Sequence, residues 1–64
     1  MDEAAIIERL RALRREASEI KTATRVYWAR SAHTKVEIEL HQRQQERLEE
    51  IRKEARGLVR HPAA

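Results

Sequence analysis

Two apolar stripes, arranged as mirror images about residue 32, constrain the fold of this chain more than any other feature. Each stripe advances mainly in steps of four and three residues, which places its side chains along one side of an α-helix, as in coiled coils. If the chain turns near residue 32, residues whose numbers sum to about 64 meet, and large side chains repeatedly face small ones. The stripes comprise Ile6, Leu10, Leu13, Ala17, Ile20, Thr24 and Tyr27, and then Val36 or Glu37, Leu40, Gln44, Leu48, Ile51, Ala55 and Leu58.

Helix-capping residues place the ends of the two helices. Asp2 is a suitable N-cap for the first helix, and Thr34 with Glu37 has the spacing of a capping box at the start of the second. Gly57 is suited to the left-handed position that follows a helix. We therefore predict an all-α fold, a single antiparallel two-helix hairpin that resembles a coiled coil. Its helices cover about residues 3–30 and 35–57, with a turn at about 31–34 and a tail at 58–64.

Two other folds are compatible with parts of the pattern. One is a single uninterrupted helix, because neither glycine nor proline occurs before residue 57. Its continued heptad seam would be mostly polar, however. The other is an αββα arrangement with strands at 24–29 and 35–40, but the intervening residues lack the Gly, Asn or Asp that tight β-hairpins favour.

The composition excludes several classes of protein. The chain has 64 residues, of which 39% are charged, with one glycine, one proline and no cysteine. It is therefore one domain at most, without disulfides or thiolate metal ligands. No apolar run approaches the roughly 18 residues of a membrane span. Because the first residues are acidic where a signal peptide would be basic, we expect a cytoplasmic protein.

Apolar residues outside the two stripes indicate that the hairpin associates with another molecule. A chain of this length buries too little surface to be very stable alone, and pairing two hairpins into a four-helix bundle would bury more. We expect a homodimer, or a complex with a partner protein, through an interface near the turn. The residues assigned to this interface are Val26, Tyr27, Trp28 and Ile38.

A cluster of arginines suggests a second type of partner. The chain has 14 basic and 11 acidic residues. In the hairpin, bases from both helices gather at the end away from the turn, and such a surface can bind nucleic-acid phosphates. A solvated face with intrahelical ion pairs explains the same residues. The residues of the nucleic-acid alternative are Arg11, Arg14, Arg15, Arg52 and Arg56.

Two histidines and a glutamate have the spacing of a helical metal site. His33, Glu37 and His41 follow one another at intervals of four, which can place imidazole and carboxylate ligands on one side of a helix. A helix that starts at Thr34 would leave His33 outside it and engage Glu37 in the cap, and His41 would then be a half-buried residue of the seam or of an interface. An engineered scaffold with a metal site is therefore only a further alternative.

No catalytic constellation is evident, because the serines and histidines lack the spacing of a nucleophile with its base. We expect no enzymatic activity and no cofactor. The sequence predicts a small interaction, assembly or regulatory protein that acts through a helical-bundle interface.

Overall fold

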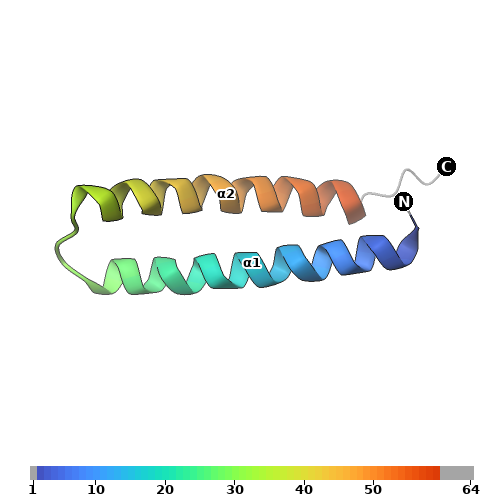
Figure 1. Cartoon of the computed structure of the whole chain (residues 1–64), viewed down its shortest axis with the longest axis horizontal. Helices are drawn as coiled ribbons and strands as arrows, with labels where there is room; N and C mark the ends of the chain where they lie inside the picture. Colours follow the sequence, from blue (N-terminus) through green and yellow to red (C-terminus); the bar gives the residue numbers. More distant parts are fainter. Residues whose placement is uncertain (1, 60–64) are drawn as a thin grey trace.

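The chain folds into two antiparallel helices joined by a short turn (Figure 1). The structure is a computed structural model that describes residues 2–59. Helix α1 spans Glu3–Ala29 and helix α2 spans Lys35–Val59. The predicted all-α hairpin is confirmed. Residues 24–29 and 35–40, the strands of the αββα alternative, are helical, and the turn excludes a single uninterrupted helix. Neither helix is long and apolar enough to cross a membrane.

Helix α1 begins at a side-chain cap, Asp2, and ends where the backbone of Arg30 leaves the helical conformation. The Asp2 carboxylate accepts a hydrogen bond of 2.7 Å from the backbone N–H of Ala5, so one of the free donors of the first turn is satisfied. At the other end, Arg30 leaves the helical conformation with φ −101° and ψ 141°. Its backbone N–H donates to the carbonyl of Tyr27 at 3.3 Å. The helix ends one residue earlier than predicted.

The capping box at the start of α2 is present with both of its hydrogen bonds. The backbone N–H of Glu37 donates to Thr34 Oγ1 at 3.1 Å, and the backbone N–H of Thr34 donates to Glu37 Oε1 at 2.8 Å. Each residue thus satisfies a donor of the other, which fixes the first turn of α2.

The predicted end of α2 at Gly57 is wrong. Helix α2 continues through Gly57 to Val59, and Gly57 has no positive φ. A glycine at the end of a helix signals termination only where the backbone adopts the left-handed conformation. Residues 60–64 of the predicted tail, including Pro62, lie outside the described residues.

A small apolar core lies between the helices in their middle and toward the end away from the turn. Leu13, Ile20, Leu48 and Ile51 are buried, and Leu13 is only 1% exposed. Partly buried Ala17, Ala55 and Leu58 pack against these four residues. All seven belong to the predicted stripes, so this part of the seam is confirmed.

The predicted seam is wrong near the turn. Leu40 is 55% exposed and Val36 is 73% exposed, whereas His41 is half-buried between the helices. His41 lies seven residues before the buried Leu48, so the heptad spacing continues through a polar residue rather than through the nearby leucine. The predicted contact between Thr24 and Leu40 is replaced by a hydrogen bond of 2.7 Å from Gln45 Nε2 to Thr24 Oγ1.

Candidate interaction surface

Two ion pairs connect the helices along one face of the hairpin. The Arg9 guanidinium donates to both carboxylate oxygens of Glu54 at 2.5 and 2.9 Å, and that of Arg47 donates to both oxygens of Glu16 at 2.6 and 2.9 Å. Both pairs match a register in which residue numbers sum to about 64. We call the side of the hairpin that carries Arg9, Glu16, Arg47 and Glu54 the ion-paired face.

The charges on the ion-paired face stabilise one another. Hydrogen bonding to Arg47 lowers the pKa of the Glu16 carboxyl, and hydrogen bonding to Arg9 lowers the pKa of the Glu54 carboxyl. The same contacts raise the pKa of both guanidinium groups. Because all four side chains are partly exposed, solvent screens these attractions and they contribute mainly to register rather than to stability.

An aromatic stack joins the helices next to the turn. The half-buried Tyr27 ring lies between two imidazoles, with ring centroids 3.7 Å from His33 and 3.9 Å from His41 and interplanar angles of 13° and 5°. His33 Nε2 donates to the Tyr27 carbonyl at 2.5 Å, so this side chain satisfies a free acceptor at the end of α1. The stack therefore connects α1, the turn and α2.

The four residues predicted to form an interface do not form one patch. Tyr27 lies between the helices, and its neighbours Val26 and Trp28 project about 100° to either side of it. Val26 lines a hollow of about 160 Å³ with Leu40. Trp28 is 67% exposed, and its ring packs edge-on against that of Tyr27, with the ring centroids 5.0 Å apart. Whether any of them binds a partner stays a prediction.

The three residues of the predicted metal site are not brought together as ligands in this structure. His33 and His41 lie on opposite sides of the Tyr27 ring, and Glu37 accepts hydrogen bonds from the Thr34 backbone and from Arg30. Hydrogen bonding with Thr34, that from its backbone first, and then the positive charge of Arg30 lower the pKa of the Glu37 carboxyl. Over residues 2–59, no group of three side chains is arranged to hold a metal ion.

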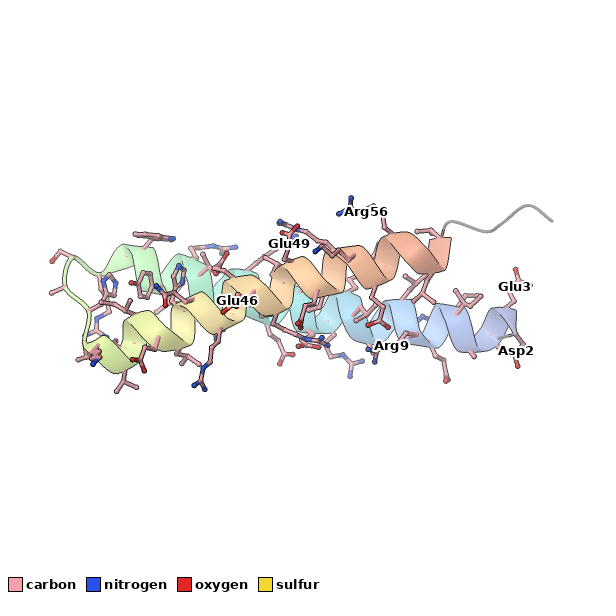
Figure 2. The ribbon with its side chains drawn as sticks, turned by 90° about the horizontal axis from the view of Figure 1, so that it is seen from above. Asp2, Glu3, Arg9, Glu46, Glu49 and Arg56 are labelled. Carbon is pink, nitrogen blue, oxygen red and sulfur yellow. The ribbon has the colours of Figure 1, made fainter. Side chains whose placement is uncertain are left out.

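Over the residues that the structure describes, no ion pair joins the two helices on the side opposite the ion-paired face. Figure 2 shows Arg9 at one long edge of the hairpin and Glu49 and Arg56 at the other. Because seam positions recur every seven residues in both helices, residues seven apart keep the same place relative to the seam. We call this second side the open face; its outer positions are Ile7, Arg14, Lys21 and Trp28 on α1, and Ile38, Gln45, Arg52 and Val59 on α2.

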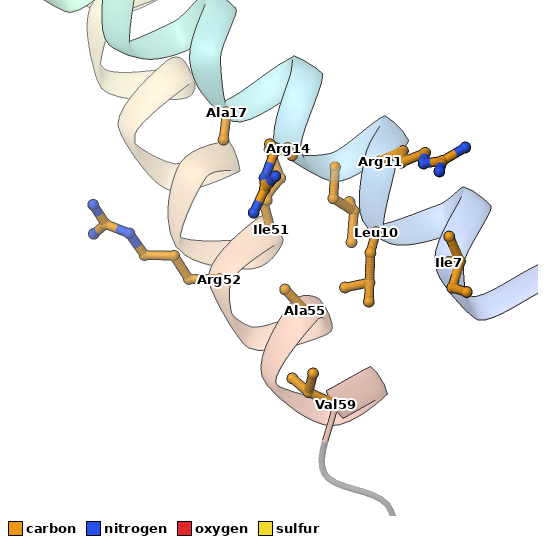
Figure 3. A pocket seen from close by; sticks show the side chains of 10 residues that line it. Ile7, Leu10, Arg11, Arg14, Ala17, Ile51, Arg52, Ala55 and Val59 are labelled. Atoms are coloured by element: carbon orange, nitrogen blue, oxygen red, sulfur yellow. The ribbon is translucent and has the colours of Figure 1, made fainter. Parts of the chain in front are cut away.

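A groove of about 500 Å³ occupies the half of the open face away from the turn (Figure 3). Its walls are mostly aliphatic and come from both helices, with the floor formed by the core side chains Leu13 and Ile51. Among the described residues that line it, only the three arginines at its margin are charged. The lining residues are Ile7, Leu10, Arg11, Leu13, Arg14, Ala17, Ile51, Arg52, Ala55 and Val59.

The groove brings together part of the predicted nucleic-acid site. Arg11, Arg14 and Arg52 line it, whereas Arg15 and Arg56 do not. Ile7 and Val59 are apolar residues outside the two predicted stripes, and the sequence prediction did not connect them with these arginines. The heptad spacing from Ile7 to Arg14, and from Arg52 to Val59, was the signal that both pairs share one face.

Comparison with known proteins yields no match to a family, to a curated protein or to a solved structure. The chain's own geometry is therefore the basis for any functional inference.

Proposed function

We propose that this chain is a non-catalytic protein-interaction module whose open face packs against further helices to complete a helical bundle. The observation that carries the proposal is the difference between the two long faces of the hairpin. Arginine–glutamate pairs bridge the helices on one face, whereas the other presents apolar side chains around a groove.

Exposed apolar side chains occur at both ends of the open face. Ile7 and Val59 lie at the end away from the turn and are 45% and 64% exposed. Trp28 and Ile38 lie next to the turn and are 67% and 40% exposed. Burial of large apolar side chains is the main favourable contribution to most protein association, so these four residues are the natural contacts for another helix pair.

The small size of the core is a second reason to propose that the hairpin packs against a partner. Only four side chains are buried in the described part of the chain, and they come from two helices that each pack on one neighbour. Helices of this kind gain most of their stability from packing. A further layer on the open face would bury Leu10 and Ala17 more completely and add to a core that is shallow in the hairpin alone.

A second copy of the chain is the simplest molecule to supply that layer. The helices have 27 and 25 residues and are roughly 40 Å long, so a second hairpin laid alongside would cover the open face from the groove to Trp28. We propose that two hairpins pair through their open faces into a four-helix bundle.

Arginines on the open face also suit phosphates, but the aliphatic surface between them does not favour a nucleic acid.

Sedimentation equilibrium tests this proposal. The wild-type chain should dimerise, and Trp28→Ala should weaken the dimer by roughly tenfold or more, because Trp28 is an exposed aromatic on the open face. Val26→Ala is the control, because Val26 is comparably exposed but lies on the ion-paired side of Tyr27. A wild-type monomer at all concentrations, equal effects of the two substitutions, or a nucleic acid co-sedimenting with the chain would contradict the proposal.

A further inference from the structure

We infer that the groove of the open face docks an acidic amphipathic helix of a partner protein, in competition with a second copy of this chain. The inference rests on the proposed function, because it assigns a specific occupant to the same face. Shape, charge and the consequences of self-pairing each support this occupant.

The dimensions of the groove fit a helix. Its lining residues extend from Ile7 to Ala17 on α1 and from Ile51 to Val59 on α2. At a rise of about 1.5 Å per residue, the longer wall measures roughly 15 Å, or about three helical turns. A helix of that length presents apolar anchors at positions i, i+3 or i+4, and i+7, which is the usual pattern of helix-in-groove recognition.

The charges at the margin specify an acidic partner. Arg11 and Arg14 lie on the α1 wall and Arg52 lies on the α2 wall, so cations border the apolar floor on both sides. Over residues 2–59 neither Arg11 nor Arg14 forms an ion pair. Arg52 forms one, in which its Nη1 atom lies 3.6 Å from Glu49 Oε2. Carboxylates on the α1 edge of an incoming apolar strip would therefore find Arg11 and Arg14, and a carboxylate on the α2 edge would share Arg52 with Glu49.

A second copy of the chain would bury the apolar floor of the groove, but its own open face would not offer carboxylates to the arginines at the margin. The charged residues at the outer positions of the open face, Arg14, Lys21 and Arg52, are all basic, so pairing two open faces brings together two surfaces of the same charge. Like charges across an interface oppose association, and added salt screens the repulsion. Self-pairing should therefore strengthen with salt, whereas an acidic helix should bind best at low salt.

Titration with a synthetic helix tests the inference. The probe is a fluorescently labelled amphipathic peptide of about 20 residues, with leucine anchors flanked on both sides by glutamate, long enough to be partly helical in water. Its control has glutamine in place of every glutamate. Fluorescence anisotropy should show saturable binding of the glutamate peptide to the full chain at low salt, and weaker binding as salt is added.

Adjacent arginines provide matched variants. Arg14→Glu should weaken binding of the glutamate peptide by roughly tenfold or more, because it reverses a charge at the groove. Arg15→Glu makes the same change in net charge but lies outside the groove, so its effect should stay within roughly twofold. Circular dichroism of both variants confirms that helix content is retained.

Several results would overturn the inference while leaving the proposed function intact. One is equal binding of the glutamine peptide; another is an equal loss with both arginine variants. A third is failure of the peptide to bind while the chain dimerises and Trp28→Ala dissociates it. The proposed function fails independently, when Trp28→Ala and Val26→Ala have the same effect on the sedimentation of the chain without peptide.

Discussion

His41 occupies a position in the seam between the helices that an apolar side chain would ordinarily fill. Its ring stacks on Tyr27 at 3.9 Å, which accounts for its burial, but its Nδ1 atom has no hydrogen-bond partner among the described residues. The sequence predicted a half-buried His41 from its spacing alone. It did not predict the stack. Stacking requires the His41 ring to lie against the Tyr27 ring, and this depends on the register of the two helices.

Replacing His41 by phenylalanine should stabilise the hairpin. A phenyl ring keeps the contact with Tyr27 and removes a buried nitrogen that lacks a hydrogen bond, a defect that costs about 1–3 kcal/mol. We expect the free energy of unfolding to rise by roughly 1 kcal/mol. Urea unfolding followed by circular dichroism measures it, and His41→Ala should lower stability. A loss of stability in His41→Phe would show that the imidazole makes a contact that phenyl does not.

At the scale of the helices, the ends nearest Asp2 and Thr34 were predictable and the end at Gly57 was not. A helix cap depends on residues three positions apart. The caps at Asp2 and at Thr34 with Glu37 can therefore be recognised from the local sequence. The end of α2 depends instead on whether Leu58 finds a neighbour on α1. It packs against the core, and that contact favours continuing the helix past Gly57.

Gly57→Ala should stabilise α2. Gly57 is helical and exposed, and a Cβ atom added there would meet nothing within 4 Å. Alanine is favoured over glycine inside a helix by about 1 kcal/mol, so we expect a gain of roughly 0.5–1 kcal/mol in the free energy of unfolding. Thermal and urea unfolding measure the change. A loss of stability would mean that the chain takes up the left-handed helix end that the sequence suggested.

At the scale of the whole molecule, the hairpin and the central core followed from the sequence, whereas the difference between the two faces did not. Periodicity identified the residues between the helices, since every residue that is buried between positions 2 and 59 belongs to a predicted stripe. It did not separate the two flanks of the seam, because that requires the register of both helices together. Only with that register do Arg9 and Glu54 meet on one flank while Ile7 and Val59 border a groove on the other.

We propose that the chain associates through its open face and not through its ion-paired face. Ile38 and Leu40 test it most directly, because they are aliphatic, exposed and two residues apart on α2, with Leu40 beside the hollow of the ion-paired side. The measurement is sedimentation equilibrium of Ile38→Glu and Leu40→Glu at high salt, where we expect self-pairing to be strongest. We predict a monomer for Ile38→Glu and a dimer like the wild type for Leu40→Glu. A dimer for Ile38→Glu with a monomer for Leu40→Glu would contradict the account and place the interface on the other face.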